Sequence, residues 1–209
     1  MIKKISIFIL SCFLFKSLYA ENNMPSAITT PIPINQIKDY DNYSAPLKNL
    51  IHEAWLLSTQ HLTYEFGSAN PNNKGMDCSG TIYYLLNKLN VPHVPRDSKG
   101  LYEWVKNFGH FYPVKIQNFA SPEFNALRPG DLLFWSGTYN NGNVQAISHV
   151  MLYLGKTLDG KPLMFGSSDG RSYCGKKMWG VSVFDFQLPH GNSNAKFLGY
   201  SCIPSLTCK

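Results

Sequence analysis

The sequence predicts an α+β fold in which N-terminal helices pack on a C-terminal antiparallel sheet. Up to about residue 107, apolar side chains recur at the spacing of amphipathic helices. After Pro129, short apolar or alternating runs follow one another, separated by Gly, Pro and Asn. The chain has 209 residues, which is enough for one domain with a sizeable core after a leader has been removed.

The first twenty residues are typical of a secretion signal. Lys3 and Lys4 form a short positive segment, residues 5–15 are apolar, and Ala20 is a small residue suited to cleavage. We therefore expect residues 1–20 to be removed and the protein to be exported, either to the periplasm or out of the cell. No other segment is long and apolar enough to cross a bilayer, so we expect no stable membrane insertion.

Charge and composition exclude some classes of partner. Removing residues 1–20 removes three lysines and no acid, so the formal net charge falls from +6 to +3. The remaining basic residues are scattered, and no nucleic-acid recognition motif accompanies them. The histidines are dispersed and no CxxC pair is present, so the sequence predicts neither a metal site nor a cofactor. We expect a monomer without nucleic-acid partners.

Residues 21–44 are polar and contain Pro25, Pro31 and Pro33, which predicts an extended tether or a strap lying on the domain. The sequence does not decide whether this segment covers a cleft. The folded domain is expected over residues 45–209. Helices are predicted over residues 46–61, from the capping residue Asp77 to Asn90, and over 98–107; strands are predicted over residues 132–135, 149–154, 163–167, 181–186 and 197–203.

Cys78 opens the second predicted helix and is the strongest candidate nucleophile. A thiol there lies beside unpaired backbone N–H groups and the positive end of the helix dipole, which favour the thiolate. Its neighbours Asp77, Ser79 and Gly80 are polar or small, which suits substrate approach better than an inert core cysteine. His149 opens an apolar strand. Alone it is typical of a satisfied core histidine, but beside Cys78 it can accept the thiol proton.

The mature chain carries four cysteines, and export implies an oxidising compartment. Two structural disulfides are one interpretation. The other is a free Cys78 with one bridge among Cys174, Cys202 and Cys208. Cys202 and Cys208 are close enough in sequence to pair, but Cys174 competes with them, so the sequence leaves the connectivity open.

Five segments, in order, resemble the NlpC-type cell-wall peptidases, a papain-like family. Together they extend from about Tyr64 to Ile203, and their order is far more specific than any single motif. They are Tyr64–Gly67 before the catalytic helix, the nucleophile motif Asp77–Gly80, the Pro-Arg-x-Ser segment within Val94–Ser98, the Pro-Gly-Asp turn within Leu127–Phe134, and the histidine strand Ser148–Gly155.

The resemblance implies a papain-like arrangement of helices against a sheet or half-barrel, and hydrolysis of peptidoglycan stem peptides. The bond is usually that between D-γ-glutamate and diaminopimelate. Mapped onto this chain, Cys78 is the nucleophile, and His149 is the general base and acid. The backbone N–H of Cys78, together with the Tyr64 hydroxyl, would stabilise the oxyanion.

The resemblance also suggests substrate-binding residues. Asp77 and Ser79 correspond to the family's recognition pair for a free substrate amine, and Arg96 and Ser98 would line or brace the cleft. A plain helix cap is the alternative for Asp77, and one side chain can serve both roles. A surface salt bridge is an equal alternative for Arg96.

The chain departs from the family at the third catalytic position, where the family usually places a His on the next strand. The strand after the histidine strand contains no His. Aligning Phe165 with the family's lead-in puts Ser167 in this position, with Ser168 and Asp169 as alternatives. Asp169 is the stronger acceptor for holding a His tautomer, and it is also a substrate-binding candidate, but we favour Ser167 because its register is better.

Three functions follow. The leading hypothesis is a secreted cysteine endopeptidase of peptidoglycan. The second keeps the site but changes the bond, as in an N-acetylmuramoyl-L-alanine amidase or another amidase or acyltransferase, because residues 166–170 and the long preceding turn would reshape the pocket. The third is an inactive wall-binding module that lost catalysis with the third His. His190 lies in a loop that can reach the cleft, but it carries no motif.

Overall fold

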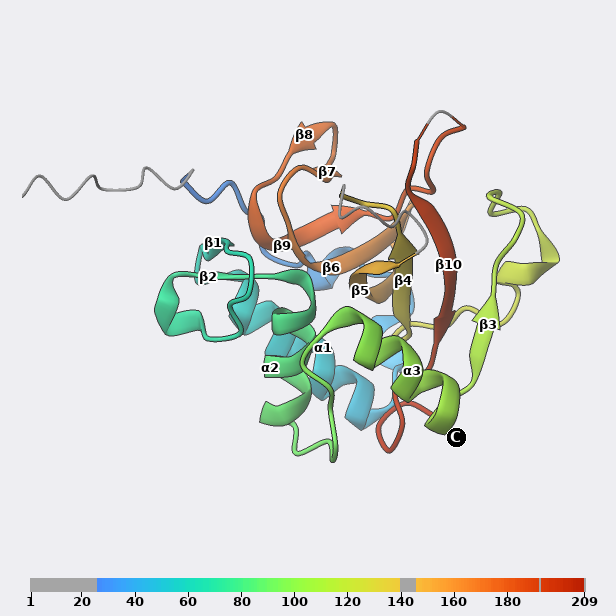
Figure 1. The fold of residues 1–209 in the computed structure, drawn as a ribbon, viewed down its shortest axis with the longest axis horizontal. Helices are drawn as coiled ribbons and strands as arrows, with labels where there is room; N and C mark the ends of the chain where they lie inside the picture. Colours follow the sequence, from blue (N-terminus) through green and yellow to red (C-terminus); the bar gives the residue numbers. More distant parts are fainter. Residues whose placement is uncertain (1–25, 140–145, 192, 209) are drawn as a thin grey trace, which may run out of the picture.

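The computed structural model describes residues 26–139, 146–191 and 193–208 (Figure 1). The predicted secretion signal lies outside the described residues. Three α-helices gather on one side of a six-stranded sheet, and α2 and α3 lie against its strand β5. Every neighbouring pair in this sheet is antiparallel, so the predicted α+β class with an antiparallel sheet is confirmed.

The helices are α1 (Ala45–Ser58), α2 (Cys78–Lys88) and α3 (Ser98–Phe108). The order of strands in the sheet is β3 (Phe111–Pro113), β10 (Lys196–Ser201), β4 (Leu132–Ser136), β5 (Ile147–Lys156), β6 (Pro162–Ser168) and β9 (Gly180–Asp185). Two short pairs complete the fold: parallel β1 (Thr63–Tyr64) and β2 (Gly75–Met76), and the hairpin of β7 (Ser172–Tyr173) and β8 (Lys176–Lys177).

Local sequence explains where the helices begin and end. Asp77 and Asp97 cap α2 and α3, each accepting a hydrogen bond from the backbone N–H three residues on. The first helix ends at Ser58, earlier than predicted, because the chain turns there and His61 adopts a left-handed backbone with φ 52°. Asn90, with φ 58°, follows the end of α2 in the same way.

Both faces of the sheet are buried. Along β5, Val150 and Leu152 face the helices, whereas Met151 and Tyr153 face a second cluster on the opposite side. That second cluster is rich in aromatic rings and includes the fully buried Trp135. This alternation matters for the site because it decides which side chains of neighbouring strands can meet.

Residues 26–44 form a strap on the domain rather than a free tether. Ile32 and Ile37 are buried, and the backbone N–H of Thr30 donates to the Ser182 hydroxyl at 2.8 Å. The backbone N–H of Val183 donates to the carbonyl of Thr30, so the strap covers the exposed edge of β9. None of the described strap residues lines the cleft beside Cys78 or His149.

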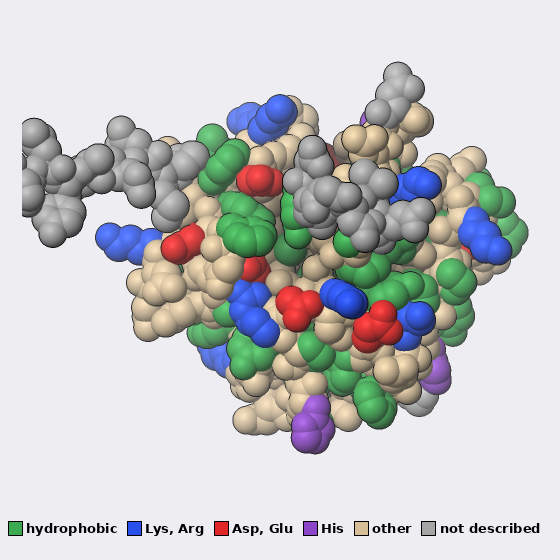
Figure 2. Space-filling view, viewed as in Figure 1, with side chains coloured by type: hydrophobic (Ala, Val, Ile, Leu, Met, Phe, Trp, Pro, Cys, Tyr) green, Lys and Arg blue, Asp and Glu red, His purple; other side chains and the backbone are tan. Residues whose placement is uncertain are grey.

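The cysteine pairing is settled by the structure. Cys202 and Cys208 form a disulfide, whereas Cys78 is free and buried and Cys174 is free and exposed. Within the described ranges, no helix is long and apolar enough to cross a membrane. Figure 2 shows acidic and basic side chains interspersed over the described part of one face, in keeping with the scattered charges of the sequence.

Candidate active site

Cys78 is the first residue of α2, directly after the cap residue Asp77. The turn is tight: a Cβ on Gly80 would lie 2.1 Å from the carbonyl oxygen of Ser68, so only glycine fits there. Only 6% of Cys78 is exposed, and it packs with the helix-side core. The nucleophile candidate is therefore well fixed, but it is more deeply buried than its polar neighbours in the sequence suggested.

Burial outweighs the helix terminus in setting the acidity of Cys78. Desolvation raises the pKa of its thiol to about 11, although backbone N–H groups oppose this, with that of Val150 contributing most. The nearby Asp77 carboxylate adds to the rise. At neutral pH the isolated site therefore holds a thiol, contrary to the expectation of a thiolate favoured by the helix dipole.

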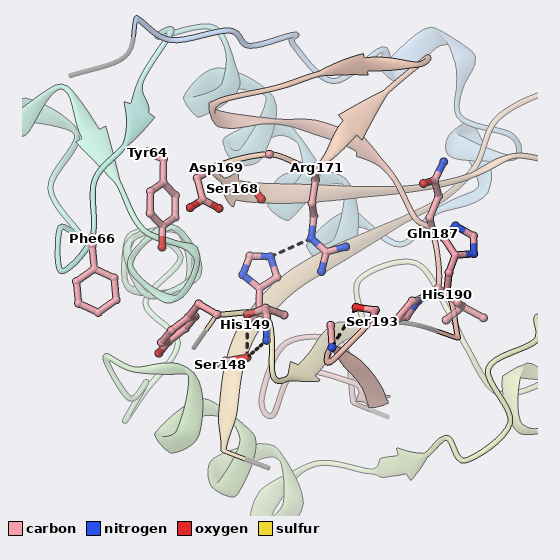
Figure 3. A pocket seen from close by; sticks show the side chains of 16 residues that line it. Tyr64, Phe66, Ser148, His149, Ser168, Asp169, Arg171, Gln187, His190 and Ser193 are labelled. Atoms are coloured by element: carbon pink, nitrogen blue, oxygen red, sulfur yellow. Dashed lines mark hydrogen bonds between the residues drawn. The ribbon is translucent and has the colours of Figure 1, made fainter. Parts of the chain in front are cut away.

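His149 lies on β5 opposite Trp135 of β4, and their ring centroids are 5.7 Å apart. Its Nε2 accepts a hydrogen bond from Nε–H of Arg171 at 3.2 Å (Figure 3). Burial, and secondly the charge of Arg171, hold the pKa of His149 well below its ordinary value. Because Nε2 is the acceptor, the neutral ring carries its proton on Nδ1.

Cys78 and His149 come together through the strand backbone. The backbone amide of Val150, the residue directly after His149, is close enough to the Cys78 sulfur to lower the pKa of its thiol. No hydrogen bond joins the thiol to the imidazole among the described residues. In Figure 3 the second ring nitrogen of His149 faces the side of the cleft where Tyr64 lies.

Ser167 does not reach the imidazole. It is fully buried, and its hydroxyl donates to the carbonyl of Met76 at 2.6 Å. The reason is strand alternation: Ser167 shares the helix-side face of β6 with Phe165, whereas His149 shares the opposite face of β5 with Met151. Ser167 thus anchors β2, the strand that leads into the candidate nucleophile Cys78.

Arg171 occupies the place beside His149 that the strand register predicted for Ser167. It follows the turn after β6, and its guanidinium carbon lies 4.3 Å from the centroid of the Trp135 ring. Ser168 and Asp169 line the cleft without a hydrogen bond to the imidazole. Sequence reasoning missed Arg171 because an arginine behind a Ser-Asp-Gly turn belongs to no motif.

Asp77 is already saturated with partners. Its carboxylate accepts from the backbone N–H of Gly80 at 2.5 Å and of Gly67 at 2.8 Å, and from the Ser79 hydroxyl at 3.2 Å. Arg96 makes a two-pronged ion pair with it, at 3.2 and 3.0 Å, and also donates to Ser79. Of the interpretations left open, helix cap and ion pair therefore describe what these side chains do in this structure.

The cleft has two adjoining chambers. Four residues line both: Tyr64, Phe66, Tyr139 and Ser148. The smaller, of about 300 Å³, contains Cys78 together with Asp77, Ser79, Arg96 and Ser98. The larger, of about 590 Å³, contains His149, Ser168, Asp169, Arg171 and His190. Every sequence-predicted site residue except Ser167 thus lines the cleft, and His190 reaches it as well.

Tyr64 stands where the two chambers meet. Burial, and secondly the proximity of Cys78, raise the pKa of its hydroxyl above the ordinary value, so the group stays protonated at neutral pH. A protonated phenol can donate a hydrogen bond to a developing oxyanion. Elsewhere in the described part of the chain, no group of His, Cys, Asp and Glu side chains has the arrangement of a metal site.

Comparison with known proteins identifies the family. A model of the NlpC/P60 family matches residues 61–175, more than half of the chain, including both Cys78 and His149. The chain belongs to the NlpC/P60 family. NlpC/P60 proteins are in general cysteine peptidases or hydrolases of the cell wall.

A solved NLP/P60-family protein from Staphylococcus aureus subsp. aureus Mu50, described as similar to a lipoprotein, shares 20% sequence identity with this chain. The match covers 78% of this chain but 43% of the solved one, with a TM-score of 0.47. This NlpC/P60 chain therefore spans less than half the length of that protein. No curated protein matches the present chain.

Proposed function

We propose that this NlpC/P60 protein is an exported cysteine endopeptidase that cleaves peptidoglycan stem peptides, with Cys78 as nucleophile and His149 as its proton-transfer partner. The observation that carries this is that Cys78 and His149 line adjoining chambers of one cleft, while the backbone amide directly after His149 acts on the Cys78 thiol. Family membership supports the cell-wall substrate. The D-γ-glutamyl–diaminopimelate amide is the bond we propose, and a papain-like packing of helices and sheet is part of the same proposal.

The chemistry begins with transfer of the Cys78 proton to His149 while sulfur attacks the amide carbonyl. The backbone N–H of Cys78 and the Tyr64 hydroxyl stabilise the oxyanion. When the C–N bond breaks, the imidazolium returns the proton to the departing amine. Water then hydrolyses the thioester, which releases the acid and restores the thiol. A buried thiol and a buried neutral imidazole favour this concerted transfer over a preformed ion pair.

Digestion of sacculi tests the proposal. The chain purified after export should release stem-peptide fragments, identified by mass spectrometry, and Cys78→Ala should abolish release. Cys174→Ala is the matched control because it removes the other free thiol, which is exposed and does not line the cleft. Equal release by wild type and Cys78→Ala would end the proposal. Release of an intact stem peptide would instead favour an N-acetylmuramoyl-L-alanine amidase or another amidase or acyltransferase on the same site.

A second candidate is an inactive wall-binding module. It is favoured by the raised pKa of Cys78 and by the hydrogen bond that Arg171 donates to Nε2 of His149. Alkylation in the Cys174→Ala background distinguishes the two functions. Binding to sacculi without any release, together with Cys78 alkylating no faster than an ordinary buried thiol in the presence of substrate fragments, would favour the binding module.

A further inference from the structure

Arg171 carries unused hydrogen-bonding capacity in the larger chamber. Its Nε–H donates to His149, but within the described ranges neither terminal nitrogen has a hydrogen-bond acceptor, and no carboxylate lies at ion-pair distance. In Figure 3 these nitrogens point into the space between His149 and the segment that carries Gln187 and His190. The guanidinium is partly buried over the Trp135 ring, which holds its plane in place.

A guanidinium whose terminal nitrogens have no acceptor among the described residues, and which lines a partly buried chamber, can bind an anion. Burial lowers the pKa of Arg171 to about 10, so the group is still fully charged at neutral pH. Besides His149, the titratable groups that act on it are Cys78 and Asp169, and Tyr64, Tyr139 and His190 line the same chamber. Asp169 is exposed and forms no ion pair with Arg171, so it does not occupy the terminal nitrogens.

The fork of a guanidinium matches a carboxylate, because two parallel N–H donors meet two oxygens. The proposed substrate supplies such a group. A glutamate linked through its γ-carboxyl keeps its α-carboxylate free within a few bonds of the scissile amide. We propose that Arg171 binds this substrate carboxylate in the larger chamber, and that binding prepares His149 for proton transfer. This inference rests on the proposed stem-peptide activity and names the group that the site recognises.

The second half of the inference follows from electrostatics. The positive charge of Arg171 disfavours a second positive charge on the adjacent imidazole. A bound carboxylate compensates that charge, and it draws the guanidinium toward the chamber and away from Nε2. The ring proton can then reside on Nε2, which leaves Nδ1 free to accept the thiol proton. Without an anionic substrate, the same contact keeps the site at rest.

Binding to the Cys78→Ala protein tests the first half without turnover. The probes are L-Ala-γ-D-Glu-meso-diaminopimelate and the same peptide with the glutamate α-carboxylate converted to a primary amide, measured by calorimetry at pH 7. The acid should bind about 10- to 100-fold more tightly than the amide. Arg171→Gln, added to Cys78→Ala, should abolish this difference. Lys177→Gln, which removes one exposed positive charge from β8, is the matched control and should preserve it.

Equal affinity for acid and amide, or no binding of either peptide, would overturn the inference. The peptide comparison uses a protein with Arg171 intact, so misfolding of Arg171→Gln cannot produce that result. Failure here is also distinct from failure of the proposed function, because release from sacculi by wild type and not by Cys78→Ala stands without it. Inorganic phosphate competing as well as the acid peptide would show general anion binding and would likewise contradict carboxylate recognition.

NMR tests the second half. The titration of His149 is followed through its labelled imidazole carbon in the Cys78→Ala protein and assigned with His149→Gln. The acid peptide should raise the pKa of His149, and the amide peptide should leave it unchanged. An equal pKa with both peptides would show that the carboxylate and the imidazole are uncoupled.

Discussion

Replacing Asp77 by Ala tests whether this carboxylate primarily holds the site together or binds substrate. The side chain caps α2, accepts from the buried backbone of Gly67 and pairs with Arg96. Loss of the cap costs about 1 kcal/mol. Leaving the Gly67 N–H without an acceptor, and the partly buried Arg96 guanidinium without its carboxylate, adds about 2–4 kcal/mol. The total of about 3–5 kcal/mol corresponds to a fall in Tm of about 6–20 °C for a domain of this size.

Two variants divide this total into its parts. Asp97→Ala removes the cap of α3. The Asp97 side chain is exposed and accepts from Gly100 N–H at 2.9 Å, so its loss should lower Tm by only about 2–4 °C. Asp77→Asn keeps an oxygen for the cap but removes the ion pair with Arg96. Its Tm should therefore lie between those of Asp77→Ala and Asp97→Ala. Calorimetry measures Tm, and digestion of sacculi measures activity. If Asp77→Ala melts within 2 °C of wild type while KM rises, Asp77 is a substrate ligand and the structural argument fails.

Two further predictions concern buried polar groups. Ser167→Ala removes the hydroxyl bound to the Met76 carbonyl and should destabilise the protein by about 1–3 kcal/mol. Ser168→Ala, at a cleft-lining position, should cost less than about 1 kcal/mol. Similar Tm values for the two variants would contradict the structural role of Ser167. Burial raises the pKa of Asp131 from 3.8 to about 7, so its contribution to stability is present below pH 3.8 and is lost as pH rises through 7. Asp131→Asn should therefore gain stability relative to wild type between pH 4.5 and 8, by at most on the order of 4 kcal/mol, and parallel pH profiles of unfolding would refute this.

Much of the local structure follows from neighbouring residues in the chain. Asp77 as a cap, the end of α2 near Asn90, and the strand after Pro129 all depend on interactions within a few residues, and each is found where the sequence predicts it. The short β1, β2 and β3 were not predicted. Their few residues pair with distant segments, so no local period marks them.

The candidate site divides in the same way. Its chemistry-bearing residues, Cys78 and His149, are recognisable from motifs in order. Their protonation is not, because desolvation depends on how completely the core closes over them. The sequence likewise shows that Cys202 and Cys208 are close enough to pair. Only the folded chain excludes Cys174 from the disulfide, because Cys174 lies exposed on the β7–β8 turn.

By itself, the sequence determined the order of the three helices and of five strands of the large sheet, the candidate nucleophile and imidazole, and the family resemblance, since each of these is carried by short segments of the chain. Only the tertiary structure decided that Ser167 faces Met76, that Arg171 faces His149, and that Arg96 forms an ion pair with the carboxylate of Asp77. Which side chains meet across strands depends on register and on the path of a turn. Both are set by packing of the whole sheet, and neither is written in any short segment.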